Sequence, residues 1–228
     1  MIGIIGGTLF TETPLFASSS PEIVKTKHGK AEITRGEKAV FINRHGTKRD
    51  KPPHMINHAA NMAAMASMGV DRIIAACSVG SLREGLPPGS IVIPNDFISL
   101  FGGSSIFNKE LRHVIPALSE ELRKILAEKA AGTGLYVENS GVYFQTRGPR
   151  LETRAEIRML AGFADVVGMT MGDEATAAAE AGIEYAAICS VDNYANGIMD
   201  AVISQEEIDR LSSKNSIVIR DIILGIVG

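Results

Sequence analysis

Two hydrophobic patterns alternate along the chain. Short runs rich in Ile, Val and Ala, typical of strands buried on both faces of a sheet, predict strands at residues 2–5, 39–42, 72–76, 90–93, 141–145, 166–169 and 185–190. Longer segments whose apolar residues recur every three or four positions predict helices at residues 57–68, 109–131, 154–163, 173–181 and 206–224. Because strands and helices alternate almost throughout, we expect an α/β fold with a mixed, mainly parallel sheet.

The chain is expected to form one domain. No internal repeat, low-complexity tract or linker interrupts the 228 residues, and the Gly-Gly-Ser-Ser stretch at residues 102–105 is short enough for a loop. The longest predicted helix, residues 109–131, contains Pro116, where it is expected either to break or to begin afresh.

Composition narrows the class of protein. Hydrophobic residues make up 45% of the chain and charged residues 21%, as in a folded globular domain. The formal net charge of −3 favours neither nucleic acid nor an anionic membrane as a partner. The longest uncharged run, residues 52–70, contains two prolines, two histidines and two asparagines, and no basic leader precedes the first apolar run. We expect a cytoplasmic protein without membrane span or signal peptide, with Cys77 and Cys189 as reduced, buried thiols.

Three loops that follow predicted strands offer donors for an anion. The first joins a glycine-rich turn, Gly-Ile-Ile-Gly-Gly, to the hydroxyl of Thr8. The second carries His45 and Arg44, whose guanidinium fork matches a tetrahedral oxyanion. The third exposes backbone N–H groups and the Ser78 hydroxyl. A packing turn or an exposed basic loop explains each of them singly, but ligands of open α/β sheets collect at the carboxyl ends of strands. Together the loops predict a phosphate site.

Other polar residues near strand ends have ordinary explanations. Glu152 precedes a predicted helix that Thr153 and Glu156 are expected to cap, and the helix dipole lowers the cost of its charge there. Asp192 and Asn193 end another strand, where turn chemistry accounts for them. None of these residues indicates a function by itself.

Taken in order, these segments resemble the trimeric purine nucleoside phosphorylase and methylthioadenosine phosphorylase family. The resemblance rests on Arg-His-Gly followed by Pro-Pro-His, and on VGSLREGLPPGSIVIPNDFI, GPRLETRAEIRML and DVVGMTMGDEA, and it covers residues 3–197. It implies a three-layer α/β/α sandwich around a mixed, partly closed sheet. It also implies a homotrimer, alone or as a dimer of trimers, that takes a purine nucleoside and inorganic phosphate and needs no metal or organic cofactor.

The resemblance also assigns roles to individual residues. Five side chains would surround the phosphate: Thr8, Arg44, His45, Ser78 and Thr170. The ribose would lie on Met169 and near Tyr143, and the base would meet Glu152 and Asn193. Catalysis is expected from the two base residues together with Arg44 and His45, with Asn193 assisting the departing purine at N7.

The two base positions predict the substrate class. Glu152 stands where the 6-oxopurine enzymes carry glutamate and the methylthioadenosine enzymes usually carry serine, and Asn193 stands where the former have asparagine and the latter aspartate. A carboxylate accepts a hydrogen bond from N1–H of a 6-oxopurine but faces a lone pair at N1 of adenine. We therefore expect hypoxanthine or guanine as the leaving base. Methylthioadenosine phosphorolysis and a non-catalytic purine-binding module are the alternatives.

The chain departs from the family pattern in two places. Gly172 and Asp173 replace a pair that usually ends in proline, which is expected to loosen the turn before the following helix. Gln205 stands about where enzymes that accept a free 5′-hydroxyl place a histidine, so Ile203 and its apolar neighbours are expected to meet a less polar 5′ group. With Glu152 and Asn193, the pattern is most similar to the methylthioinosine phosphorylases.

The remaining histidines and a methionine series are interpreted as structural. His28 is expected in a solvated strand or turn and His113 on a helix surface. Packing in a core or subunit contact is expected of four residues on one predicted helix: His58, Met62, Met65 and Met68. The chain has no HExxH, paired CxxC or EF-hand motif, so no metal site is predicted.

Overall fold

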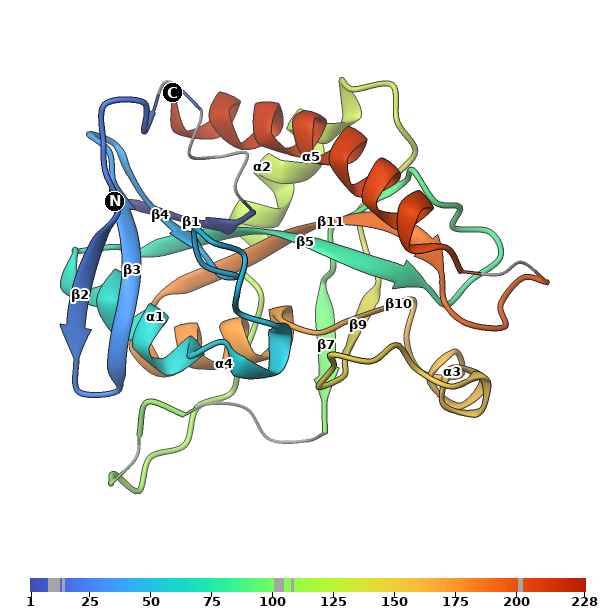
Figure 1. The fold of residues 1–228 in the computed structure, drawn as a ribbon, viewed down its shortest axis with the longest axis horizontal. Coiled ribbons are helices and arrows are strands. Elements are labelled where there is room, and N and C mark those ends of the chain that lie inside the picture. Colours follow the sequence, from blue (N-terminus) through green and yellow to red (C-terminus); the bar gives the residue numbers. More distant parts are fainter. Residues whose placement is uncertain (8–12, 14, 101–104, 108, 201–202) are drawn as a thin grey trace.

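The computed structural model describes residues 1–228 apart from 8–12, 14, 101–104, 108 and 201–202. Its strands form one branched sheet (Figure 1). The main path runs in the order β2 (Glu22–Thr26), β3 (Gly29–Arg35), β4 (Ala39–Asn43), β1 (Ile2–Gly6), β5 (Arg72–Ser81), β10 (Val166–Gly168), β9 (Val142–Gln145) and β7 (Asp96–Ser99). A second path leads from β5 to β11 (Glu184–Tyr194), β6 (Ile91–Val92) and β8 (Val137–Glu138).

The sheet branches at β5. The first four residues of β5 pair in parallel with β1, its last two pair antiparallel with β10, and β11 runs parallel to it throughout. Among the described strands, six pairs are parallel and four are antiparallel. The predicted mixed, mainly parallel sheet is therefore confirmed.

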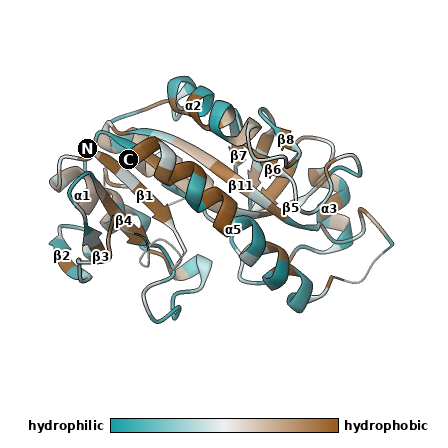
Figure 2. Cartoon of the chain, turned by 90° about the horizontal axis from the view of Figure 1, so that it is seen from above, coloured by the Kyte–Doolittle hydropathy of each residue, from teal (hydrophilic) through white to brown (hydrophobic). Residues whose placement is uncertain are grey.

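Helices cover both faces of this sheet. α1 (His58–Ser67) and α4 (Met171–Ala181) lie on one face, and α2 (Glu120–Ala131) and α5 (Gln205–Val227) on the other (Figure 1). Apolar and polar residues alternate along α5 (Figure 2), as on a helix with one buried side. α3 (Arg154–Leu160) packs against β9 and β10, and a 3-10 helix, Pro53–Met55, precedes α1. This is the three-layer α/β/α arrangement that the family resemblance implies.

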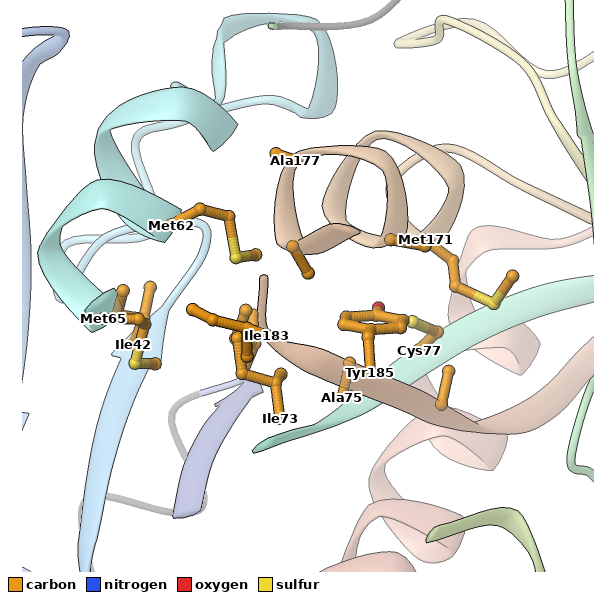
Figure 3. Packing of buried hydrophobic residues seen from close by; sticks show 14 of the residues in the cluster. Ile42, Met62, Met65, Ile73, Ala75, Cys77, Met171, Ala177, Ile183 and Tyr185 are labelled. Atoms are coloured by element: carbon orange, nitrogen blue, oxygen red, sulfur yellow. The ribbon is translucent and has the colours of Figure 1, made fainter. Parts of the chain in front are cut away.

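Two apolar cores, one on each side of the sheet, explain why its strands are apolar on both faces. On one side Met62 and Met65 of α1 pack in a cluster with Ile73 and Tyr185 (Figure 3). On the other side, Ile74 packs in the cluster that holds the apolar faces of α2 and α5. Consecutive strand residues face opposite sides, so two neighbouring isoleucines of β5 belong to different cores. The packing role predicted for the methionines is confirmed.

Only the second half of the longest predicted helix, residues 109–131, is helical in the structure. α2 begins after Ser119, whose side chain caps it. Residues 109–119, the first part of the predicted helix, form no helix. Pro116 lies in that irregular stretch, where Leu111 and Ile115 are 93% and 94% exposed. The fresh start near Pro116 is the alternative that holds, and the prediction that His113 lies on a helix is wrong.

Strand boundaries differ from the prediction where small or polar residues suggested loops. β5 continues to Ser81 and β11 to Tyr194, several residues beyond the predicted ends. The short strands β7 and β8 and the β2–β3 hairpin were not predicted, and the hairpin turn holds His28. The turn expected for His28 is confirmed.

The start of α4 corrects another expectation. The helix begins at Met171, so Gly172 and Asp173 lie in its first turn instead of a loosened segment before it. Both residues donate their backbone N–H groups to Oε1 of Gln145, at 2.6 and 3.2 Å. A side-chain acceptor thus satisfies the free N–H groups of the helix terminus, and no proline is needed there.

Within the described part of the chain, no helix is long and apolar enough to cross a membrane. Cys77 and Cys189 are both buried and free, as predicted.

Candidate active site

Arg44 follows the last residue of β4 and is only 5% exposed. Its Nε and Nη2 donate to the two carboxylate oxygens of Glu174 on α4, at 2.7 and 3.0 Å. Its Nη1 donates to the carbonyl oxygen of Ala76 at 2.6 Å. The bidentate edge that was expected to meet an oxyanion is therefore held by Glu174, and a further ligand can approach only the Nη1 and Nη2 end.

Both members of this pair stay charged. Burial by itself lowers the pKa of Arg44, but the Glu174 carboxylate beside it raises that pKa well above its usual value. Burial likewise opposes ionisation of Glu174, yet Arg44 holds the pKa of this carboxyl below its usual value. The Tyr185 hydroxyl donates to Glu174 Oε2 at 2.8 Å. Because the pair is neutral overall, an anion bound beside it needs additional donors.

Two more side chains complete the Arg44 cluster, which we define as Arg44, Cys77, Thr170 and Glu174. Cys77 Sγ lies 3.7 Å from Arg44 Nη2 and 4.0 Å from Thr170 Oγ1. Cys189 on β11 lies opposite Cys77 on β5, and hydrogen bonding with Cys189 lowers the pKa of the Cys77 thiol. Thr170 is the N-cap residue of α4, and its hydroxyl makes no capping hydrogen bond. The cluster thus lies at the positive end of a helix dipole, where anions are stabilised.

Ser78, expected in the phosphate site, does not join this cluster. Its hydroxyl donates to Asp192 of β11. Because consecutive strand residues face opposite sides, only one of Cys77 and Ser78 can face Arg44. Sequence reasoning missed Cys77 because the small residues that follow it suggested a loop. Its even spacing from Ile73, which faces the same core, was the signal that could have identified it.

His45 is half-buried beside the cluster. Its Nδ1 lies 2.8 Å from the carbonyl oxygen of Lys51, and because a carbonyl only accepts, Nδ1 carries a proton. Burial lowers the pKa of His45, so near pH 7 the ring is neutral and its Nε2 is an acceptor, not the donor expected from the sequence. Thr8, also predicted to bind phosphate, lies outside the described residues.

A cavity of about 830 Å³ opens next to the cluster, and we call it the Glu152 cavity. Its lining includes Phe144, Thr146, Glu152, Met159, Met169 and Asp173. Glu152 is 8% exposed, and its Oε1 accepts a hydrogen bond from Thr146 Oγ1 at 2.6 Å. The cavity therefore presents the oriented Glu152 carboxylate beside aromatic and thioether side chains, and two further acidic residues, Glu156 and Asp173, also line it.

Local structure places Glu152 directly before α3. Thr153 is the N-cap, and the predicted capping box is confirmed: Thr153 Oγ1 accepts from the Glu156 N–H at 3.2 Å, and Glu156 Oε2 accepts from the Thr153 N–H at 2.7 Å. Hydrogen bonds from Arg150 hold the pKa of Glu156 at about 2. Asn196 Nδ2 donates to the backbone carbonyl of Glu152 at 3.0 Å. These contacts fix the backbone on both sides of Glu152.

Of the four residues predicted to meet the sugar and the base, two lie outside this cavity lining. Tyr143 is fully buried, and its hydroxyl accepts from the N–H groups of Thr170 and Met171 at 3.1 and 3.3 Å, which holds the start of α4. Asn193 is half-buried near the end of β11, and its Nδ2 donates to the Tyr194 carbonyl at 2.7 Å. Among the predicted residues, the structure brings Arg44 close to Thr170 and places Glu152 and Met169 in one cavity.

His58 lies between the cluster and the cavity. It is 2% exposed, with Nδ1 4.0 Å from Glu174 Oε1 and Nε2 4.0 Å from Asp173 Oδ2. Burial lowers the pKa of His58, which keeps the ring neutral near pH 7. Among the residues that the structure describes, no group of three or more His, Cys, Asp or Glu side chains is placed to hold a metal ion.

Comparison with known sequences identifies relatives of this chain. The sequence model of the Phosphorylase superfamily matches residues 1–227. The chain is 48% identical over 221 residues to an Archaeoglobus fulgidus protein named "Probable 6-oxopurine nucleoside phosphorylase", covering 95% of this chain and 91% of that protein. It is 37% identical over 219 residues to a Methanocaldococcus jannaschii protein named "Probable S-methyl-5'-thioinosine phosphorylase", covering 91% of this chain and 84% of that protein.

Solved structures of similar fold include a nucleoside phosphorylase. Methylthioadenosine phosphorylase from Schistosoma mansoni in complex with adenine superposes with a TM-score of 0.88 and 28% sequence identity, covering 99% of this chain and 90% of that chain. The family match spans nearly every residue, including all those of the Arg44 cluster and the Glu152 cavity. The chain therefore belongs to the Phosphorylase superfamily.

Proposed function

We propose that the protein catalyses reversible phosphorolysis of 6-oxopurine nucleosides, including 5′-methylthioinosine, to the free base and a pentose 1-phosphate. One observation carries the proposal: Met169 and Thr170 are consecutive, and they face different parts of one site. Thr170 Oγ1 belongs to the Arg44 cluster, whereas Met169 lines the Glu152 cavity. Phosphate at the cluster and a purine against Glu152 would thus flank one sugar resting on Met169.

The environment of Glu152 supports a 6-oxopurine as the base. Thr146 donates to Oε1, so this carboxylate acts as an acceptor and its Oε2 can take N1–H of hypoxanthine or guanine. Adenine would present a lone pair instead, and an unmatched polar group in a desolvated site costs about 1–3 kcal/mol. The names of the two relatives, one a 6-oxopurine nucleoside phosphorylase and one a methylthioinosine phosphorylase, agree with this assignment.

The mechanism follows from placing the reactants side by side. As the bond from C1′ to the purine breaks, its electron pair leaves with the base and the sugar becomes cationic; a phosphate oxygen then forms the new bond to C1′. A phosphate dianion held by Arg44 and Thr170, at the positive end of the α4 dipole, stabilises that cation and removes the entropic cost of encounter. The neutral His45 can accept the proton that the phosphate hydroxyl loses as the ester forms, and the departing purine anion takes up one proton, which balances the reaction. Asn193 would donate to N7 of the leaving base, and no cofactor takes part.

The 5′ end of the sugar is proposed to carry a methylthio group in the preferred substrate. Gln205, at the position discussed above, is exposed on the first turn of α5, and its Nε2 donates to Asp209 Oδ1 at 3.0 Å. A side chain engaged on the helix surface offers little to a 5′-hydroxyl. Ile203, half-buried just before α5, favours an apolar 5′ group.

One assay tests these proposals. Inosine, guanosine, methylthioinosine and methylthioadenosine are incubated with the enzyme, with and without phosphate, and the released base is measured. We expect phosphate-dependent release of hypoxanthine and guanine, fastest from methylthioinosine, unchanged after dialysis against a chelator. Preferential release of adenine would assign the protein to the methylthioadenosine phosphorylases instead. Binding of nucleoside without phosphate-dependent release would make it a non-catalytic module.

We also propose that the protein acts as a homotrimer, or a dimer of trimers, in the cytoplasm. The free thiols of Cys77 and Cys189 suit a reducing compartment. Leu111 and Ile115, nearly fully exposed in the single chain, suit a subunit contact. Sedimentation equilibrium should give a mass three or six times that of the chain, and a monomer would refute this assembly.

A further inference from the structure

A β-bulge in β11 lies one residue before Asn193. Along the pairing with β5, Val191 lies opposite Val79 and Asn193 lies opposite Gly80, so Asp192 is an extra residue with no partner of its own. A bulge of this kind bends its strand and re-aims the side chain that follows it. The side chain that follows here is the one proposed to meet the base.

The carboxylate of Asp192 ties this bulge to its surroundings. It is fully buried, and the hydroxyls of Ser78 on β5 and Ser190 on β11 donate to its two oxygens. The Ser212 hydroxyl of α5 is near enough to lower the pKa of this carboxyl group. Asn215 of α5, 1% exposed, donates from Nδ2 to Ser190 Oγ at 2.8 Å. One carboxylate thus joins the bulge to the neighbouring strand and to the C-terminal helix.

These partners are hydroxyls, not cations. Burial raises the pKa of Asp192, and the hydroxyls of Ser190, Ser78 and Ser212 oppose that rise. A buried carboxyl group is costly unless its hydrogen bonds are satisfied. Two hydroxyl donors, Ser78 on β5 and Ser190 on β11, each hold one carboxylate oxygen, so the side chain at the bulge has one orientation.

On the opposite side, the space over Gly80 receives the Asn193 amide. A Cβ atom at position 80 would lie 3.3 Å from Asn193 Nδ2, closer than an ordinary contact, and the backbone of Gly80 has no positive φ that demands glycine. The missing side chain therefore leaves room for the amide. Asn193 is placed from one side by the bulge and from the other by this space.

We propose that Asp192 is a positioning residue for base recognition: through the serine hydroxyls and α5 it fixes the bulge that directs the Asn193 amide toward N7 and O6 of the purine. This inference rests on the proposed function, in which Asn193 meets the base. It makes α5 part of the specificity apparatus, although Asp192 itself touches no substrate.

The experiment compares base discrimination in a set of variants. For each, kcat/KM is measured with methylthioinosine and methylthioadenosine, together with KM for phosphate and Tm. Asp192→Ala should lower the ratio of the two kcat/KM values by about tenfold or more, because displacing a contacting group by even 1 Å can be that costly, while KM for phosphate changes little. Asp192→Asn should keep the ratio close to the parent, since a serine hydroxyl can rotate to accept from the new amide.

Two further variants separate positioning from mere stability. Gly80→Ala should lower the same ratio, because the new Cβ displaces the Asn193 amide without altering Asp192. Ile223→Ala removes buried packing between α5 and the sheet, so it should lower Tm but leave the ratio unchanged. If Asp192→Ala does not fold, the proposal is still tested by Gly80→Ala, which should lower the ratio, and by Asp192→Asn, which should keep it.

Asn193→Ala separates the positioning role of Asp192 from the proposed role of Asn193 at the base. If this variant loses base discrimination while Asp192→Ala and Gly80→Ala keep it, the positioning role is refuted and the proposed function stands. A loss of discrimination in Ile223→Ala equal to that in Asp192→Ala would also refute it, because general loosening would then suffice. If Asn193→Ala itself keeps full discrimination, the proposed role of Asn193 is wrong and this inference falls with it.

Discussion

Arg44 and Glu174, 130 residues apart in the sequence, form a buried two-point ion pair, with Nε to Oε1 at 2.7 Å and Nη2 to Oε2 at 3.0 Å. The pair joins the end of β4 to α4 across the carboxyl end of the sheet. It also holds Nη2 of the guanidinium 3.7 Å from Cys77 Sγ, which in turn lies 4.0 Å from Thr170 Oγ1. In the proposed function, Glu174 would therefore act on phosphate binding through Arg44 without being a phosphate ligand.

Arg44→Ala is expected to have two separable effects. Phosphate loses a cationic donor, so KM for phosphate rises strongly. Glu174 is left as a buried, unpaired charge, which typically costs about 3–5 kcal/mol of folding free energy. Steady-state kinetics and urea unfolding measure the two effects.

The double variant Arg44→Met with Glu174→Gln serves as the control for that prediction. It removes the unpaired charge and keeps an acceptor for the Tyr185 hydroxyl, so part of the lost stability should return while KM for phosphate stays high. Normal phosphate kinetics in either folded variant would remove Arg44 from the phosphate site.

The same pair predicts how stability depends on pH. Arg44 holds the pKa of Glu174 below its usual value of 4.5 in the folded protein, against the opposing effect of burial. Below pH 4.5 the unfolded chain therefore binds more protons than the native state, and stability falls as the pH falls. The difference in unfolding free energy between the parent and Glu174→Gln should be constant at higher pH and should shrink in that acidic range. Glu37→Gln, at an exposed loop position, should track the parent at every pH.

Thr146 supplies a prediction about the Glu152 carboxylate. Valine is close to threonine in shape but has no hydroxyl, so Thr146→Val removes the donor that holds Glu152 Oε1. The carboxylate should therefore lose its fixed orientation. Loss of one hydrogen bond to a charged group is worth about 1.5–3 kcal/mol, so kcat/KM for methylthioinosine should fall by about tenfold or more. Thr153→Ala is the matched control, because it weakens the α3 cap and lowers Tm but leaves the carboxylate partner in place. Equal losses in both variants would mean that the Thr146 hydrogen bond has no special role.

Sequence patterns predicted most of the architecture because they report local burial. The alternating runs identified the central strands, and Thr153 with Glu156 identified the α3 cap. Patterns failed where a predicted apolar face has nothing in the single chain to pack against: Leu111 and Ile115 have helical spacing, yet they are 93% and 94% exposed and the described residues around them form no helix.

The site shows the same division. Arg44 and Thr170 could be selected from their residue type and their place after a strand, whereas Glu152, which precedes α3, was assigned a role only through the family resemblance. Cys77 could not be selected, because its role depends on the face of β5 it occupies, and the strand was taken to end before it. The bulge at Asp192 was likewise invisible, because it exists only in the pairing of β11 with β5.

Glu152 and Asn193 together are expected to set the choice of base. In the double variant Glu152→Ser with Asn193→Asp, the serine removes a carboxylate from the N1 lone pair of adenine. The aspartate can accept from the N6 amino group and, when protonated, donate to N7. A site built to pair with a donor discriminates by about 10²-fold or more when that donor is missing, because its own acceptor is left unpaired.

The measurement is the ratio of kcat/KM for methylthioinosine to that for methylthioadenosine, in the parent, both single variants and the double variant. The ratio should be well above one in the parent. In the double variant it should shift toward methylthioadenosine by more than the product of the single effects, since both residues are proposed to contact the same ring. KM for phosphate should stay near the parent value, because the Arg44 cluster is untouched. A parent that already prefers methylthioadenosine, or an active double variant with an unchanged ratio, contradicts the assignment of these two residues.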